Sequence, residues 1–389
     1  MNDKARILMC VTALPGDVSG AAKQGYMLAD VLRRKDAAVI FLVLTEAPGT
    51  RKPWVKRIRY PDQDIYLVPC FRRRWAMPYT LLLGCVVLLA LRNRYDIFHA
   101  HGGPRHFIWL GTFARCFGKT SIVKNTLVGY DSADVILSEF GPFMFRLYAG
   151  NAAIVCMTSE QERLALEAGI DKERVHRVPN GVDLSRFNPR PPAKKQGDGR
   201  VHLVSVGYMV PRKGFDHLIR VLARLVETGT DVDLRIVTHL RNMGEDSTAY
   251  LAELKQLRGS AGVEDRVYFS DDQDVPGHLR QADLFVFASR GEGFGTVQIE
   301  AMASGLPSVA TRLPGVNTDI YRDGIDAYLV ALDDVDEMVD KIAHLARHPD
   351  QREQMGQAAR GRAESMFSLE SVADQYLQLY GALKSSAGQ

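Results

Sequence analysis

The strongest constraint on the fold is an alternation of short apolar runs with amphipathic stretches, which occurs twice along the chain. Helix-like stretches, such as residues 21–34, separate most of the strand-like runs. Strands that alternate with helices indicate βαβ units and therefore parallel sheets. The strand-like runs are 6–13, 38–44, 65–70, 96–102, 121–127 and 153–159, then 201–207, 233–239, 266–270, 284–289 and 307–311.

The alternation stops at residues 178–200, where VPNGVDLSRFNPRPPAKKQGDGR is rich in Pro, Gly, Asn and Lys, as linkers are. We therefore predict an α/β protein with two doubly wound, Rossmann-like domains that face each other across a cleft. The predicted N-terminal domain comprises residues 1–180 and the C-terminal domain residues 181–366. Residues 367–389 are expected to form a C-terminal helix that packs back toward the N-terminal domain.

Composition narrows the class of protein. The 389 residues are 46% hydrophobic and 24% charged, which is ordinary for a soluble protein of two domains. The five cysteines are scattered without a CxxC pair, which favours reduced thiols over disulfides or a zinc site. The longest apolar run, at 81–91, is about half of what a membrane span needs, and the first apolar run is too short for a signal peptide. We expect a cytoplasmic protein.

The stretch ASRGEGFGTVQIEAMASGLPSVA, residues 288–310, carries the clearest chemical pattern. Each glycine would cost a helix about 1 kcal/mol, so Glu292 is predicted to lie in a loop after the strand 284–289. The residues from Thr296 onward favour a short helix that ends near Gly305, with Glu300 one turn inside it.

This arrangement suits a nucleotide sugar. Glycine loops expose backbone N–H groups and helix N-termini attract phosphate, so we assign Gly293, Phe294, Gly295 and Thr296 to donor binding. A carboxylate at Glu300 can accept hydrogen bonds from a ribose diol. The alternative is a structural turn with one solvated and one capping glutamate. A dinucleotide site is less well supported, because GEGFG is not GxGxxG.

The chain resembles glycosyltransferase family 4, whose members have the GT-B fold. Two glutamates separated by seven residues and followed by AMASGLP (301–307) carry the resemblance, as do DIFHAHGG (96–103) and VGYMVPRKGFDHLI (206–219). The segments VPNGVDLSRFNP (178–189), TDIYRDGIDAYLV (318–330) and FSLESVADQYLQLY (367–380) are also similar to family segments. The resemblance extends over nearly the whole chain.

The resemblance implies a retaining transfer from a sugar nucleotide, with neither a metal nor another cofactor in the active site. It implies that Glu300 binds the ribose, and that Glu292 is catalytic: it contacts the hydroxyls of the donor sugar and supports charge on the anomeric carbon. It also implies that Lys213 neutralises the diphosphate, which a compact cation does well. In the first domain, Gly20 would let the backbone approach the phosphates and His101 would lie near the anomeric centre. The leaving phosphate would take the acceptor's proton.

Two positions depart from the family pattern. Tyr208 stands where the family usually has Arg, and Arg212, beside Lys213, is the candidate to supply the missing charge. Asp319 stands where Glu is common. His99 shares a strand and a side-chain direction with His101, but it lies farther from the strand end and is more easily interpreted as structural. Asp131, in GYD after a strand, is a candidate for the acceptor cleft.

Three acidic clusters, at 231–233, 271–274 and 333–336, resemble metal-binding DxD sequences. They lie at strand or helix boundaries, away from the donor motif. We interpret them as turns and helix caps.

Charge is unevenly distributed along the chain. Residues 1–180 carry a net charge of +9 and residues 181–389 a net charge of −6. The stretches 51–60 and 71–75 combine basic residues with Trp54 and Trp75, and the apolar 79–92 follows. This favours a peripheral contact with an anionic membrane surface. The alternative is a buried core helix with solvated arginines; nucleic acid is less well supported, because no known binding fold accompanies the charge.

Together these patterns predict a hexosyltransferase that uses a UDP- or GDP-sugar and a glycan or polyprenyl-linked acceptor. The basic first domain places it at the inner face of the cytoplasmic membrane, and the resemblance to the family implies a role in bacterial lipopolysaccharide or exopolysaccharide synthesis. Two alternatives remain: a nucleotide-sugar epimerase of the same fold, and a non-catalytic nucleotide-sugar-binding module.

Overall fold

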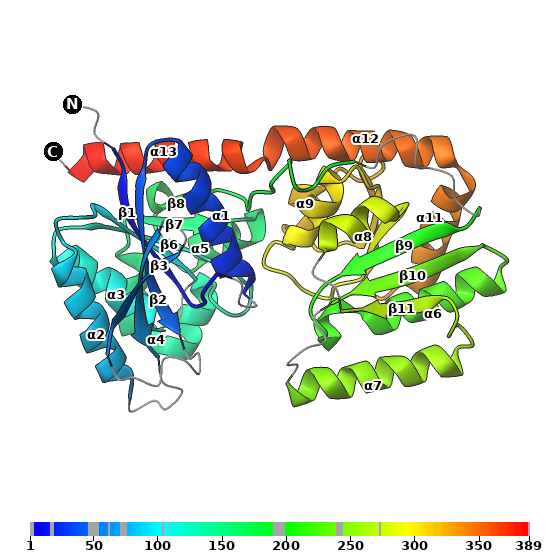
Figure 1. Ribbon diagram of the computed structural model, residues 1–389, viewed down its shortest axis with the longest axis horizontal. Coiled ribbons are helices and arrows are strands. Elements are labelled where there is room, and N and C mark those ends of the chain that lie inside the picture. Colours follow the sequence, from blue (N-terminus) through cyan, green and yellow to red (C-terminus); the bar gives the residue numbers. More distant parts are fainter. Residues whose placement is uncertain are drawn as a thin grey trace. The chain divides into compact units, whose positions relative to one another are not determined.

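The computed structural model describes residues 4–15, 19–45, 54–60, 63–70, 76–102, 105–189, 199–238, 244–271 and 274–387. The chain forms two compact units (Figure 1). Unit 1 comprises Met1–Gly181 and Leu369–Gln389, and unit 2 comprises Val182–Ser368. The chain thus passes between the units twice, and the backbone N–H of Val182 donates to the carbonyl of Phe367 at 2.8 Å.

Unit 1 contains an eight-stranded sheet with the order β3-β4-β2-β1-β5-β6-β7-β8. Only the edge strand β3 is antiparallel to its neighbour. The strands are β1 (Arg6–Val11), β2 (Ala38–Thr45), β3 (Lys56–Tyr60), β4 (Gln63–Pro69), β5 (Ile97–His101), β6 (Thr120–Lys124), β7 (Ala153–Cys156) and β8 (Val175–Arg177). The helices are α1 (Gly20–Arg34), α2 (Met77–Ala90), α3 (Arg105–Cys116), α4 (Ala133–Ala149), α5 (Ser159–Glu167) and α13 (Leu369–Ala387).

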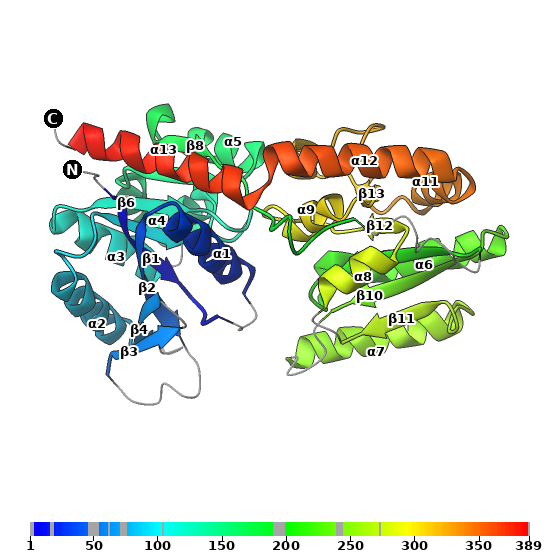
Figure 2. The same ribbon diagram turned by 45° about the horizontal axis from the view of Figure 1, so that its top comes forward.

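Helices cover both faces of this sheet because its strands are apolar on both sides. In β1, Ile7 and Met9 belong to a core layer that they share with α1 and α13. Leu8 and Cys10 point to the opposite face and belong to the layer shared with α2, α3 and α4. The C-terminal helix α13 packs against α1 (Figure 2).

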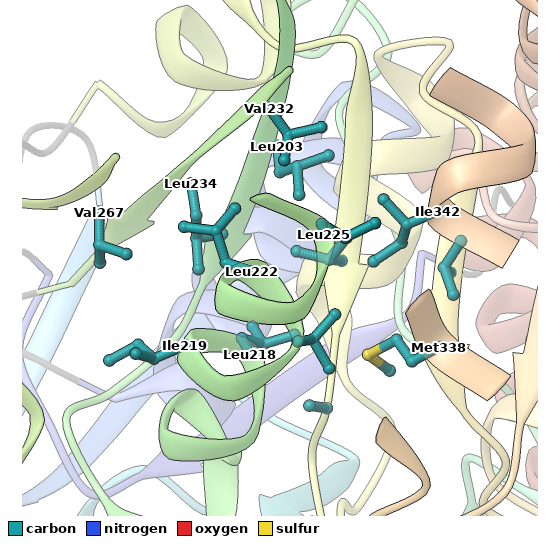
Figure 3. Packing of buried hydrophobic residues seen from close by; sticks show 14 of the residues in the cluster. Leu203, Leu218, Ile219, Leu222, Leu225, Val232, Leu234, Val267, Met338 and Ile342 are labelled. Atoms are coloured by element: carbon teal, nitrogen blue, oxygen red, sulfur yellow. The ribbon is translucent and has the colours of Figure 1, made fainter. Parts of the chain in front are cut away.

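Unit 2 contains a six-stranded parallel sheet with the order β11-β10-β9-β12-β13-β14. Its strands are β9 (Val201–Val206), β10 (Val232–Val237), β11 (Val267–Ser270), β12 (Leu284–Phe287), β13 (Ser308–Thr311) and β14 (Ala327–Val330). Its helices are α6 (Phe215–Glu227), α7 (Glu245–Ser260), α8 (Val275–Gln281), α9 (Thr296–Ala303), α10 (Asn317–Ile320), α11 (Val335–Arg347) and α12 (Pro349–Met366). Figure 3 shows Leu222 and Leu225 of α6 among strand residues and Met338 and Ile342 of α11.

The strand order places a switch point in each sheet. In unit 2, β9 pairs with β10 on one side and β12 on the other, so successive connections leave in opposite directions. In unit 1, β1 lies in the same way between β2 and β5. Doubly wound sheets bind ligands beyond the carboxyl ends of the strands at such points. The two sheets confirm the predicted fold class.

Three strands, β3, β8 and β14, were not expected from the sequence. Lys56–Tyr60 belongs to the basic stretch that we interpreted as a membrane contact, yet it forms an edge strand with mostly exposed side chains. An edge strand can carry charged side chains, because these face solvent. Such charges also prevent the strand from pairing with another sheet. The other basic residues of that stretch, at 51–53 and 71–75, lie outside the described residues.

Candidate functional site

The predicted donor residues of unit 2 lie in the two loops that flank its switch point. Residues 207–214 follow β9 and residues 288–295 follow β12. Gly214 has φ +67°, and a Cβ added there would lie 2.0 Å from the carbonyl oxygen of Ala288. The two loops therefore approach each other at a distance that only glycine permits.

Glu292 is buried at the centre of these loops. Its Oε1 lies 2.5 Å from the Nζ of Lys213 and 3.3 Å from the Nη1 of Arg212. The hydroxyl of Ser289 donates to the same oxygen at 2.7 Å. Because all of these contacts fall on Oε1, the Oε2 of Glu292 has no hydrogen-bond partner within the described part of the chain.

Lys213 is itself largely buried, so its aliphatic stem is part of the site. A Cβ at Gly207 would lie 3.3 Å from both Cδ and Cε of Lys213, so the stem lies across the end of β9. Its ammonium also lies 5.6 Å from the centroid of the Phe287 ring. The position of the cation is therefore set by packing as well as by the Glu292 carboxylate.

Glu300 lies in α9, as the sequence predicted, and is buried. Tyr208 lies close enough for the two groups to interact: its partial burial and then the negative charge of Glu300 raise the pKa of the Tyr208 hydroxyl. Tyr208, which stands where the family usually has Arg, is therefore a neighbour of Glu300, the predicted ribose ligand.

The other predicted donor residues form the start of α9. Gly295 precedes the helix with φ +80°, and Thr296 is its first residue. The side chain of Phe294 is buried, with its ring centroid 6.0 Å from that of Phe367, so only its backbone is placed to meet a ligand. Gly293 is also buried.

Arg290 joins the two loops and was not singled out from the sequence. Its backbone N–H donates to the carbonyl of Arg212 at 2.8 Å. Its guanidinium donates to both carboxylate oxygens of Asp216 at 3.0 Å, and its Nε donates to Asp333 at 3.0 Å. Burial raises the pKa of Asp216, but hydrogen bonds from Arg290 and then Arg220 outweigh this effect and hold the pKa well below its usual value. Asp216 is therefore a permanent anion on which Arg290 is fixed.

The predicted residues of unit 1 also lie at a switch point, beside the ends of β5 and β1. His101 ends β5 and is buried, and neither of its ring nitrogens has a hydrogen-bond partner among the residues described. His99 lies on the same face, with ring centroids 4.5 Å apart, and its Nδ1 is 2.8 Å from the Tyr380 hydroxyl. Burial and then the charge of Lys124 lower the pKa of His99 to about 3.

Gly20 lies at the start of a helix, and Asp131 lies in the loop after β6. Gly20 is the first residue of α1, whose N-cap is Ser19, and a Cβ there would meet no atom within 4 Å. Asp131 is buried and accepts hydrogen bonds from the backbone N–H groups of Thr126 and Leu127 at 2.8–2.9 Å. Its carboxylate therefore holds the loop after β6 in shape.

The acidic clusters include helix caps. Asp274 caps α8 and Asp334 caps α11 through side-chain hydrogen bonds to backbone N–H groups. In the resolved ranges given above, no three His, Cys, Asp or Glu side chains gather as metal ligands.

Ser289, Arg290, Gly207 and Gly214 are the site residues that sequence reasoning missed. Gly207 and Gly214 both lie in VGYMVPRKGFDHLI, but the close contact at Gly214 comes from Ala288, a residue of another segment, and so could not be seen in the sequence. Ser289 ends the sequence LFVFAS, where it was counted as part of a strand.

Comparisons with known proteins identify the family of this chain. The family "Glycosyltransferase Family 4" matches residues 18–186, and "Glycosyl transferases group 1" matches residues 189–362. Mannosylfructose-phosphate synthase of Agrobacterium fabrum is 31% identical over 60% of this chain, and the match spans about half of that relative, 53%. The crystal structure of Anabaena HepE in complex with UDP and glucose has a TM-score of 0.75 at 18% identity, covering 97% of this chain and 99% of that one.

A further relative matches over a larger share of its own length. It is the GDP-mannose-dependent alpha-(1-6)-phosphatidylinositol monomannoside mannosyltransferase of Mycolicibacterium smegmatis, 31% identical over 64% of this chain and 67% of the relative. The family matches cover both halves of the chain, and this relative is matched over two thirds of its length. The chain belongs to glycosyltransferase family 4.

Proposed function

We propose that this protein is a retaining glycosyltransferase that transfers a hexose-type sugar from a UDP- or GDP-sugar without a metal or another cofactor. The observation that carries the proposal is the pair of glutamates at the unit 2 switch point. Glu292 keeps one carboxylate oxygen without a partner in the described residues, and Glu300 lies buried in the following helix. The names of two similar proteins, one bound to UDP and one GDP-mannose-dependent, support both nucleotides as candidates.

Each residue of the site has a role in this proposal. Glu300 accepts hydrogen bonds from the ribose, and the Oε2 of Glu292 contacts the hydroxyls of the donor sugar. Lys213 and Arg212 neutralise the diphosphate, and Gly293, Phe294, Gly295 and Thr296 present backbone groups to it. In unit 1, Gly20 lets the backbone approach the phosphates, His101 meets the acceptor hydroxyl and Asp131 shapes the acceptor loop.

The acceptor is a glycan or a polyprenyl-linked saccharide in this proposal. The reaction would serve bacterial cell-surface polysaccharide synthesis at the inner face of the cytoplasmic membrane. The relative that is named for a phosphatidylinositol monomannoside supports a lipid-linked acceptor.

Release of nucleoside diphosphate from UDP-, GDP- and ADP-sugars tests the proposal, with crude membrane lipid as the acceptor. In Glu300→Gln the ribose loses a charged acceptor, so we expect the KM for the donor to rise about 10- to 100-fold. Glu227→Gln, at the exposed end of α6, is the control and should retain wild-type kinetics. Donor binding without turnover would favour a binding module, and sugar inversion without transfer would favour an epimerase. An absence of donor binding would refute the nucleotide-sugar assignment.

We also propose that unit 1 contacts an anionic membrane surface through α2 and β3. One face of α2 is in the core, whereas Leu82, Val86 and Leu89 on the other face are exposed. The exposed Lys56, Arg57 and Arg59 of β3 would add attraction to anionic lipid. No helix among the described residues is long and apolar enough to cross a membrane.

Sedimentation with phosphatidylglycerol vesicles tests this contact, with phosphatidylcholine vesicles as the reference. A Leu82→Asp, Val86→Asp double variant should bind the anionic vesicles at least about tenfold more weakly, because charged side chains oppose insertion of the exposed face of α2 into the lipid. Leu332→Asp changes an exposed leucine of unit 2 and should bind as the wild type does. Equal binding by all three proteins would refute the assignment to α2.

A further inference from the structure

A buried polar cluster of unit 1 contains a lysine for which the proposed reaction gives no role. Lys124 ends β6 and is the register partner of His101 at the end of β5. Side chains of register partners on neighbouring parallel strands leave the sheet on the same face. Lys124 therefore lies beside His101 in the layer between the sheet and the helices α1 and α13.

Among the described residues, the hydrogen-bond partner of Lys124 is a neutral acceptor and not a carboxylate. Its Nζ donates to the Oδ1 of Asn180 at 2.7 Å and lies 5.7 Å from the centroid of the Tyr376 ring. No ion pair joins Lys124 to an acidic residue in the described ranges. Burial of an ammonium group without a negatively charged partner costs free energy.

The groups that face this cluster come from four segments. His99 and His101 come from β5, Lys124 from β6, Tyr376 and Tyr380 from α13, and Asn180 from the segment after β8. The buried side chains of α1 are uncharged. Burial raises the pKa of both tyrosines, so neither of them supplies a negative charge. Lys124 and the two histidines are therefore the groups that compete for a proton here.

We propose that Lys124 is a positioning residue for His101: it holds the single positive charge of this cluster and so leaves His101 neutral at the carboxyl end of β5. Like charges on paired residues of neighbouring strands disfavour each other in a low-dielectric interior. The ordering of pKa values agrees, because burial lowers the pKa of Lys124 to about 7, whereas burial, His99 and Lys124 together lower that of His101 well below 6.5.

A neutral His101 matters for the acceptor. A neutral imidazole can accept a hydrogen bond from a hydroxyl at one nitrogen, whereas imidazolium can only donate. Both ring nitrogens of His101 are without a partner among the described residues, so one of them is available for that bond. This inference rests on the proposed transferase function, in which His101 meets the acceptor hydroxyl.

The direct test is the histidine ring NMR signal of His101, assigned by its loss in His101→Gln. In the wild type, His101 should stay neutral as the pH falls through the range in which exposed histidines titrate. In Lys124→Met its titration midpoint should rise by on the order of one pH unit or more, because the competing charge is gone. Asn180→Asp should raise it too, since a carboxylate offsets the ammonium without leaving a cavity.

The kinetic test is the acidic limb of kcat/KM for nucleoside-diphosphate release. That limb should move to higher pH in Lys124→Met and in Asn180→Asp, and should stay in place in Lys124→Arg. Lys119→Met removes a charge just before β6 and serves as the control, for which we expect the acidic limb of the wild type. A His101 that stays neutral over the same pH range in Lys124→Met as in the wild type would overturn the inference. Failure of the wild type to turn over any donor would instead refute the proposed function, and the NMR result would still stand.

Discussion

Gly214→Ala is the sharpest test of how the donor loops are held together. Gly214 has φ +67°, and an added Cβ would lie 2.0 Å from the oxygen and 2.9 Å from the carbon of the Ala288 carbonyl. The obstacle is backbone, which cannot be relieved by a rotamer change. An L-residue in the left-handed region costs about 1–2 kcal/mol, and displacement of the loop adds to it. We expect a total loss of about 2–4 kcal/mol in the free energy of unfolding.

Gly229→Ala is the matched control for this variant. Gly229 has φ +79°, but nothing lies within 4 Å of its added Cβ. It lies before the amino end of β10, whereas the donor loops follow the carboxyl ends of β9 and β12. It should therefore lose only the conformational part, about 1–2 kcal/mol. The difference between the two alanine variants measures the contact between the loops.

Urea unfolding of the wild type and both variants gives the stability differences. Nucleoside-diphosphate release gives the effect on the site. We expect kcat/KM for the donor to fall at least about tenfold in Gly214→Ala, because Lys213 is the adjacent residue, and to stay at the wild-type value in Gly229→Ala. Equal unfolding free energies and equal turnover in the two variants would refute the reasoning.

Two further predictions concern charged groups. Arg290→Met should raise the KM for the donor by about tenfold or more with a smaller change in kcat, because the contacts of Arg290 with Asp216 and Asp333 position the loop. Arg200→Met, which removes a surface partner of Asp231, is the control and should keep the wild-type KM. The folded pKa of Lys124 is about 7 against 10.5 for an unburied lysine, so between these values the unfolded chain binds more protons and stability rises with pH. Relative to Lys124→Met, the wild type should gain up to about 1.4 kcal/mol of unfolding free energy per pH unit between about pH 7.5 and 9.5 in urea unfolding. Parallel pH profiles over that range would show that Lys124 in the folded protein stays charged well above pH 7.

The sequence was sufficient for two parallel sheets to be expected, because buried parallel strands are nearly continuous apolar runs. It was insufficient where a strand is polar. Lys56–Tyr60 pairs with β4 at the edge of unit 1, and nothing in KRIRY distinguishes such a strand from a solvated loop. Position along the sheet, which decides whether a strand needs apolar side chains, is a property of the tertiary structure.

The same limit applies to the site. Glu292 and Glu300 were placed in a loop and a helix, because glycine spacing and the apolar pattern are local signals. The partners of Arg290 were not, since Asp216 precedes it by 74 residues and Asp333 follows it by 43. Only the strand order brings the three residues together. The cluster around Lys124 was missed for this reason too, because its members come from β5, β6, α13 and the segment after β8.

The glycines of the donor loops explain why the charges of this site have fixed positions. Lys213 can reach Glu292 because its stem lies across Gly207, and the turn that carries it can approach β12 because residue 214 has no side chain. A larger residue at position 207 or 214 would displace the Lys213 ammonium although the lysine itself is unchanged. The ion pair between Lys213 and Glu292 is therefore a consequence of backbone packing. Variants that add one methyl group to the loops should then disturb donor binding while every charged group of the site is retained.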